Sequence, residues 1–164
     1  MIFVTVGSQK FPFDRLVEAA DTLVATGAVE GGAFAQTGSC TYVPEHMGHV
    51  AFLDREGFRA RMGICDVVIT HGGTGAIIGA VKAGKRVIAV PRRASYGEHV
   101  DDHQVEIVSQ FADMGLIEPC MDPIDLPAAY ARALSKTYRS YKSNTEHFVA
   151  DLAEYIDSVG EGRR

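Results

Sequence analysis

The segment from Asp66 to Val90 limits the possible folds more than any other part of the sequence. An apolar run over residues 66–70 is followed by paired glycines and a helical apolar pattern over 74–83. Gly84 then ends the helix, and a second apolar run covers 86–90. A strand–helix–strand unit of this length pairs its strands in parallel through a right-handed crossover. The chain is therefore expected to contain a parallel sheet covered by helices.

The remaining apolar patterns extend this unit in both directions. Strands are expected at 2–6, 31–36, 50–53 and 116–118, and helices at 13–25, 56–64 and 100–114. Asp14 is placed to cap the first helix. One or two amphipathic helices are expected over about 125–159. The pattern predicts an α/β fold with a doubly wound, mostly parallel, Rossmann-like sheet. Residues 1–164 are expected to form one domain, with its core over about 1–120.

The composition is that of a soluble globular protein, with 46% hydrophobic and 23% charged residues among 164. The net charge of −5 disfavours a nucleic-acid partner, which usually meets a basic face. Cys40, Cys65 and Cys120 lack zinc-type spacing and are expected to be reduced thiols. The sequence shows neither a signal peptide nor an apolar run of about 20 residues, so a cytoplasmic location is expected.

The glycine-rich turn at residues 71–75 is the first candidate ligand site. Ligands of open parallel sheets bind beyond the carboxyl ends of the strands, where Gly7-Ser8 and Gly38-Ser39 are also expected. Consecutive glycines let a phosphate approach the backbone, and the helix that follows offers free N–H groups. The same glycines could equally serve only a tight turn. The segment matches neither the P-loop nor the G-x-G-x-x-G pattern, which disfavours a nicotinamide enzyme.

A polar segment over residues 96–104 is the second candidate. Asp102, His103 and Gln104 combine donors and acceptors that suit sugar hydroxyls, while Asp101 could instead cap the helix. The pair His99 and His103, four residues apart, could bind a metal, but the spacing is not that of a known zinc motif, and no metal is expected. Arg92 and Arg93 follow a strand end and could meet a diphosphate or a carboxylate, or be surface charge.

Three segments together resemble a known family: residues 4–8, 65–75 and 97–104. They are similar to the C-terminal domain of family 28 glycosyltransferases, over about residues 1–120. The stand-alone version in bacterial exopolysaccharide and capsule clusters is the most similar, and the soluble subunit of the eukaryotic two-part N-acetylglucosaminyltransferase is a further relative. The resemblance implies the donor-binding, C-terminal half of a GT-B enzyme. A membrane-associated partner would then bind the lipid-linked saccharide acceptor.

The resemblance also implies roles for individual residues. Gly7, Ser8 and Gln9 match a phosphate-side loop, Phe52 and Leu53 the uracil region, and His103 with Gln104 the pair that touches the donor sugar. Many members carry a ribose-binding glutamate where this chain has Gly79, so either Glu98 replaces it or uridine is recognised less strictly. The expected UDP-sugar site comprises Gly7, Ser8, Gln9, Phe52, Leu53, His71, Gly72, Gly73, Thr74, Gly75, Arg92, Glu98, Asp102, His103 and Gln104.

The expected function is that of the catalytic, UDP-sugar-binding subunit of a two-chain inverting glycosyltransferase. It would add a hexose or hexuronic acid, with glucuronate or galactose favoured, to a polyprenyl-diphosphate-linked sugar. The partner is expected to supply the general base, and His99 is the local candidate. No cofactor is expected, and the partner would recruit the chain to the inner face of the plasma membrane. The alternative is a non-catalytic subunit that binds the nucleotide sugar and enhances a partner transferase.

Overall fold

A single parallel sheet forms the centre of the computed structural model, which describes residues 1–143, 149–153 and 155–156. Within these residues the sheet has six strands in the order β3-β2-β1-β4-β5-β6, and every neighbouring pair is parallel. The strands are β1 (Ile2–Thr5), β2 (Ala33–Gln36), β3 (Gly48–Val50), β4 (Val67–His71), β5 (Arg86–Val90) and β6 (Glu118–Pro119). This order is that of a doubly wound Rossmann sheet, and it confirms the predicted fold class.

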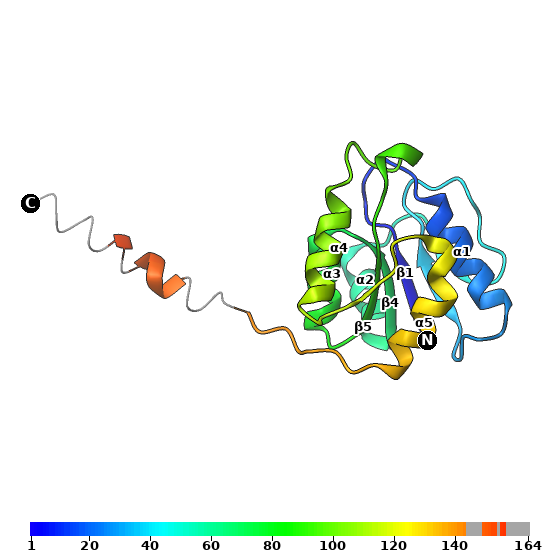
Figure 1. Ribbon diagram of the computed structural model, residues 1–164. Helices are drawn as coiled ribbons and strands as arrows, with labels where there is room; N and C mark the ends of the chain where they lie inside the picture. The colour runs from blue at the N-terminus through cyan, green and yellow to red at the C-terminus, as the bar shows by residue number, and fades with distance from the viewer. Residues whose placement is uncertain (144–148, 154, 157–164) are drawn as a thin grey trace, which may run out of the picture.

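Helices cover both faces of the sheet (Figure 1). They are α1 (Asp14–Ala25), α2 (Arg55–Ile64), α3 (Thr74–Lys82), α4 (His103–Asp113) and α5 (Leu126–Ser135), with short 3-10 turns η1 (Ala94–Tyr96) and η2 (Pro123–Asp125). One apolar core joins the sheet to α1 and α5, and the other joins it to α2, α3 and α4. Because both faces are covered, the central strands β1 and β4 are buried along their whole lengths.

The strand order reverses between β1 and β4, which are neighbours in the sheet. From β1 the chain continues through α1 to β2 on one side, whereas β4 continues through α3 to β5 on the other. The connections therefore diverge and leave a crevice at the carboxyl ends of these two strands. This is the place where open α/β sheets bind their ligands.

Four local predictions are wrong in detail. The strand expected at 116–118 is β6, which covers only Glu118–Pro119. The strand expected at 50–53 is β3, which ends at Val50 because its partner Gln36 is the last residue of β2. The helix expected from residue 100 begins at His103. Asp14 does not cap α1; its carboxylate instead accepts hydrogen bonds from the N–H groups of Thr41 and Tyr42. Asp14 thus holds the loop after β2 against α1.

The C-terminal third is less helical than predicted within the described residues. Helix α5 ends at Ser135, and residues 136–143 contain no helix. Glu118 of β6 is buried and binds Arg132, Lys136 and Tyr138, which fixes α5 and the segment after it to the edge of the sheet. Residues 149–153 are helical, while 144–148, 154 and 157–159 of the expected helices lie outside the described residues.

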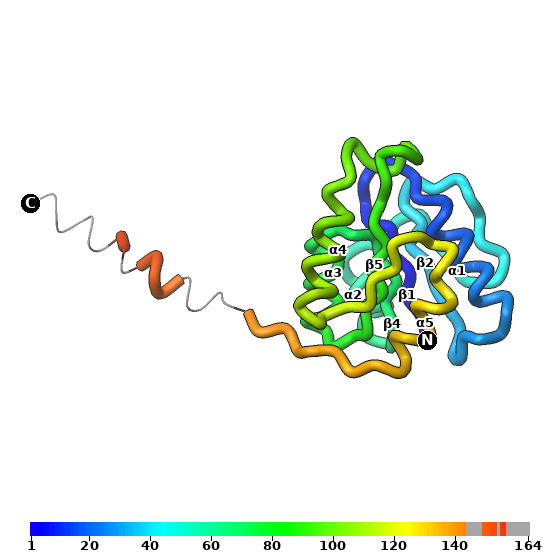
Figure 2. The backbone as a smooth tube through the Cα atoms, viewed as in Figure 1, coloured from blue at the N-terminus to red at the C-terminus, as the bar shows by residue number. Residues whose placement is uncertain are grey.

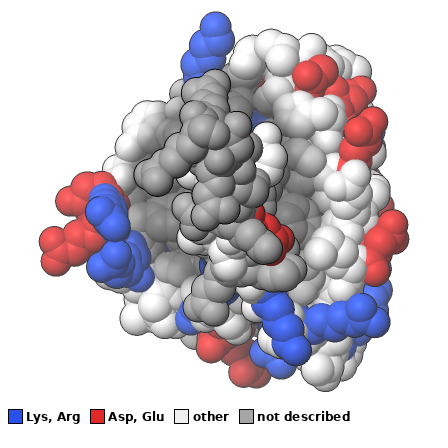
Figure 3. Space-filling view, turned by 90° about the vertical axis from the view of Figure 1, so that its left-hand side faces the viewer, with Lys and Arg blue, Asp and Glu red and all other residues white. Residues whose placement is uncertain are grey.

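Charged side chains of both signs lie on the side of the molecule formed by α2, α3 and α4. On its visible part, acidic side chains lie along the right-hand edge, and acidic and basic side chains lie side by side at the left and along the lower edge (Figure 3). No helix in the described part of the chain is both long and apolar enough to cross a membrane.

Candidate functional site

Three loops meet at the carboxyl ends of the central strands. They are the segment between β1 and α1, the glycine turn between β4 and α3, and the segment from Pro91 to Asp102 between β5 and α4. In Figure 2 the first of these, in dark blue, lies beside the green segment that follows β5. Residues far apart in the sequence are thereby brought to one edge of the sheet.

A cleft of about 970 Å³ opens beside these loops and runs between α2 and α3. Of the residues expected to bind a ligand, those lining it are Gly7, Ser8, Gln9, Leu53, His71, Gly73 and Gly75. The other expected residues do not line it: Phe52, Gly72, Thr74, Arg92, Glu98, His99, Asp102, His103 and Gln104. The cleft thus brings together the first glycine loop and the second, but not the polar segment before α4.

The His71 ring fills the space between the two glycine turns. A Cβ atom at Gly7 would lie 2.6 Å from His71 Cε1, and one at Gly73 would lie 2.9 Å from Cδ2 and still nearer to Nε2. Both glycines are therefore needed for the ring to occupy this place. Burial, together with the nearby charge of Arg92, lowers the pKa of His71 to about 4. The ring is consequently neutral at pH 7 and adds no positive charge to the cleft.

The N-terminus of α3 faces the cleft without a side-chain cap. Gly73 occupies the capping position, and no side chain of the described residues caps the first turn. Gly75 and Ala76, in that turn, line the cleft. Uncapped N–H groups and the positive end of the helix dipole form an anion site, with glycine allowing close approach.

Gln104 ties the glycine turn to the end of β5. Its Oε1 atom accepts hydrogen bonds from the N–H groups of Gly72, at 3.0 Å, and Arg92, at 3.2 Å. The side chain is 2% exposed. Because both acceptor positions of the amide oxygen are used, the Nε2 group is the part of Gln104 that remains to contact a ligand.

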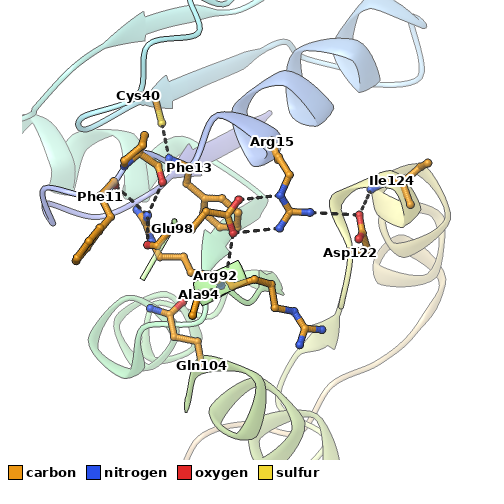
Figure 4. A network of polar contacts seen from close by, with 12 residues as sticks. Phe11, Phe13, Arg15, Cys40, Arg92, Ala94, Glu98, Gln104, Asp122 and Ile124 are labelled. Atoms are coloured by element: carbon orange, nitrogen blue, oxygen red, sulfur yellow. Dashed lines mark hydrogen bonds and ion pairs between the residues drawn. The ribbon is translucent and has the colours of Figure 1, made fainter. Parts of the chain in front are cut away.

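Arg92 lies in the protein interior, in contrast to the expectation that it meets a diphosphate or a sugar carboxylate. Its guanidinium donates to the carbonyl oxygens of Val6, Phe11, Pro12 and Glu98, at 2.7 to 3.1 Å. Figure 4 shows Arg92 with Phe11 and Glu98. The residue is 0% exposed. The Nη1 and Nη2 donors thus hold the backbone of the β1–α1 and β5–α4 loops together, whereas the buried Nε has no partner among the described residues.

Glu98 is also placed differently from the expectation that it binds ribose. Its carboxylate accepts hydrogen bonds from Arg15, at 2.7 and 3.0 Å, and from the N–H of Arg93, at 2.9 Å (Figure 4). The Arg15 guanidinium in turn lies 3.9 Å from the centre of the Tyr96 ring. Both carboxylate oxygens are therefore occupied within the protein, and Glu98 joins α1 to the β5–α4 loop.

His99, Asp101 and His103 form a cluster that could hold a metal ion. Their ligand atoms lie within 4.8 Å of one another, and the Nδ1 atoms of both histidines contact Asp101 Oδ1. The His99 ring packs on Phe11, with centres 5.9 Å apart. Two imidazoles and a carboxylate suit a divalent transition metal. Asp102, beside them, instead accepts a hydrogen bond from the Ala94 N–H.

The wall of the cleft formed by α2 did not emerge from the sequence. Phe58 and the two arginines Arg55 and Arg59 line it, and Gln36 lies at its inner end. Gln36 donates to the Gly7 carbonyl and accepts from the Leu53 N–H, so it connects the two sides of the opening. The spacing of the arginines, four residues apart in a predicted helix, is the signal that could have identified a common face.

Comparisons with known proteins agree with this architecture. The sequence matches the glycosyltransferase family 28 C-terminal domain over residues 1–156. No match is found among curated proteins.

Solved structures of glycosyltransferases share the fold. The glycotransferase of kitacinnamycin aligns at a TM-score of 0.58 with 16% identity, over 82% of this chain and 35% of that one. MurG of Acinetobacter baumannii aligns at a TM-score of 0.56 with 19% identity, over 80% of this chain and 40% of MurG. The calicheamicin glycosyltransferase CalG4 aligns at a TM-score of 0.56 with 16% identity, over 80% of this chain and 34% of CalG4. The chain thus spans between a third and two-fifths of the length of these enzymes.

Proposed function

Because the chain belongs to the glycosyltransferase family 28 C-terminal domain family, we propose that its cleft binds the UDP-sugar donor of an inverting glycosyltransferase. The observation that carries the proposal is the uncapped N-terminus of α3, which opens into the cleft at the switch point of the sheet. A diphosphate placed there would meet backbone N–H groups and the positive end of the helix dipole. Gly7, Ser8 and Gln9 would approach it from the β1 side.

In this proposal the acceptor half of the active site comes from a separate membrane-associated subunit. That subunit would bind a polyprenyl-diphosphate-linked saccharide and hold this chain at the cytoplasmic face of the plasma membrane, in exopolysaccharide or capsule synthesis. The chain matches a C-terminal domain and aligns with a third to two-fifths of the similar enzymes, so an acceptor-binding half would lie outside the matched residues. Co-purification of the chain with a membrane-associated transferase subunit would test this arrangement.

The proposed chemistry is the displacement of UDP from the anomeric carbon by an acceptor hydroxyl. The α3 N-terminus would stabilise the negative charge that develops on the leaving diphosphate, without a resident metal or cofactor. A general base must also remove the acceptor proton. The partner would supply this base, since His99 does not line the cleft and its Nδ1 atom lies 3.3 Å from Asp101.

Glucuronate, galactose and other hexoses remain candidate donor sugars. The preference for an acidic sugar rested on Arg92 and Arg93, and Arg92 is enclosed by backbone carbonyls. Arg93 is half-buried and not part of the cleft wall. The sugar would be contacted by the Gln104 amide nitrogen and by Asp102 or His103 as the acceptor half closes over the site.

A thermal-shift and calorimetric screen tests the donor-binding proposal. The ligands are UDP, UDP-glucuronate, UDP-galactose, UDP-N-acetylglucosamine and NAD. A ligand at 100 times its Kd stabilises the folded state by about 2.7 kcal/mol, which raises Tm by roughly 5–10 °C in a domain of this size. We expect this shift with UDP compounds and none with NAD. The proposal would be refuted if only NAD raised Tm, or if none of the nucleotides raised it.

A non-catalytic enhancer of a partner transferase is the alternative function. In a reconstituted complex, Gly73→Ala should abolish transfer if this cleft holds the reacting donor, because the new methyl group displaces His71 at the α3 N-terminus. Gly79→Ala adds the same methyl group farther along the α3 wall of the cleft, where a Cβ meets no atom within 4 Å, and so shows the effect of an added methyl group that leaves His71 in place. Unchanged transfer with Gly73→Ala would favour the enhancer.

A further inference from the structure

Two arginines on α2 face the cleft with their charges unpaired. Arg55 and Arg59 are one helical turn apart, both are exposed, and both line the cleft. Neither has a hydrogen-bond or ion-pair partner among the described residues. Arg61, on the same helix, differs because its guanidinium stacks on Phe34 at 3.6 Å from the ring centre and does not line the cleft.

The other charged groups of the cleft are already paired. Asp54 is the only acidic residue in its described lining, and its Oδ1 atom caps α2 through the N–H of Gly57 at 2.7 Å. Lys85, at the far end, donates to the carbonyls of Gly63 and Cys65. A chain of net charge −5 therefore presents unpaired positive charge on one wall of this cleft. Such a wall attracts an anionic ligand.

The opposite wall, formed by α3, lacks side chains that could bind sugar hydroxyls. Gly75 and Gly79 lie along it, and a Cβ atom at either position would meet no atom within 4 Å. Nucleotide-binding sites usually hold the ribose hydroxyls with a carboxylate, whereas arginine binds phosphate. Glu98 is enclosed, and Asp54 commits Oδ1 to the cap of α2, so the described lining offers the ribose only the second carboxylate oxygen of Asp54.

We propose that Arg55 and Arg59 bind the diphosphate from the α2 wall, opposite the α3 N-terminus. The nucleotide is then recognised through its phosphates, and the ribose hydroxyls contribute little to affinity. This inference rests on the proposed UDP-sugar site and adds the side chains that hold the ligand there. Guanidinium groups suit this task because each can form two parallel hydrogen bonds with a phosphate.

Calorimetric titration of the full chain with UDP, UMP and 2′-deoxy-UDP tests the inference. We expect Arg55→Ala/Arg59→Ala to weaken UDP binding by roughly 10- to 100-fold, and UMP binding by less, because UMP offers fewer charges. The control Arg61→Ala/Arg86→Ala removes the same charge from residues outside the cleft and should change the Kd of UDP by less than about threefold. In the wild type, 2′-deoxy-UDP should bind within about threefold of UDP.

Two outcomes would overturn the inference while the donor site stands. One is equal UDP affinity in the cleft double variant and the control. The other is a loss of about tenfold or more when the 2′-hydroxyl is removed. Failure of the wild-type chain to bind any UDP compound would instead refute the donor site itself. Thermal melts of each variant check folding, which both substitutions should preserve because these side chains are exposed or peripheral.

Discussion

Replacement of Arg92 by methionine tests whether a buried guanidinium holds the site loops together. Methionine retains the length and apolar contacts of the stem but removes every donor. Four carbonyl oxygens would lose a charged partner, those of Val6, Phe11, Pro12 and Glu98. Because Arg92 is fully enclosed, water cannot reach all of them without opening the loops.

The expected loss of stability follows from the burial of these contacts. The hydrogen bonds to Val6 and Glu98 are buried, whereas those to Phe11 and Pro12 are partly buried and can be replaced by water. A buried acceptor left unpaired costs about 1–3 kcal/mol, so two such acceptors give roughly 2–6 kcal/mol. For a domain of this size, that range lowers Tm by roughly 5–20 °C.

Urea unfolding followed by circular dichroism measures the effect, with Arg93→Met as the matched control. Arg93 lies in the same loop, and its hydrogen bonds to Glu98 and Tyr96 are made by its backbone, so they survive the substitution. The control should change the free energy of unfolding by less than about 0.5 kcal/mol. If Arg92→Met lost no more stability than Arg93→Met, the buried guanidinium would not be a determinant of the fold.

Three further substitutions or conditions probe the site. Burial lowers the pKa of His71 to about 4, whereas the same side chain in the unfolded chain takes up a proton below about pH 6.5. The free energy of unfolding should therefore fall by up to about 3 kcal/mol as the pH is lowered from 6.5 to 4. Urea melts at several pH values measure this fall, which should be shallower in His71→Gln. Gly73→Ala should lower Tm because its new methyl group clashes with His71. Gly79→Ala should instead raise the free energy of unfolding by about 0.5–1 kcal/mol, because the helix gains an alanine in open space. Equal Tm values for the two variants would contradict this expectation. Gln104→Glu keeps an acceptor for the Gly72 N–H and should destabilise less than Gln104→Ala, as thermal melts of the two variants can decide.

The fold could be predicted because its strands are short apolar runs with clear ends. Residues 86–90 were expected as a strand and form β5 with the same limits. The less accurate boundaries lie where tertiary contacts decide them. Residue 50 ends β3 because the neighbouring strand ends there, and His103 begins α4 only after a turn that includes the Asp102–Ala94 hydrogen bond. Neither contact leaves a trace in the local sequence.

The roles of the two adjacent arginines could not be separated by sequence. Arg92 and Arg93 have the same chemistry and follow the same strand, yet one is fully buried and the other half-buried. The difference arises because β5 directs the first side chain toward the β1–α1 loop, where its guanidinium donates to the Pro12 and Val6 carbonyl oxygens. Similarly, only the packing of α2 beside α3 turns Arg55 and Arg59 toward a cleft.

The polar residues from Arg92 to Gln104 mainly hold the protein together, and backbone groups of other loops line the ligand cleft. Arg92, Glu98 and the Gln104 oxygen bind other parts of the protein, and they join the loops after β1, β4 and β5 into one connected unit. The groups that reach the cleft near the α3 N-terminus are largely backbone, at Gly7, Gly73 and Gly75. A ligand anion would therefore meet donors whose positions are already set before it binds, which reduces the entropy lost on association. It follows that substitutions at Arg92 or Glu98 should weaken nucleotide binding in proportion to their loss of stability, whereas substitutions at the cleft arginines should weaken it with stability unchanged.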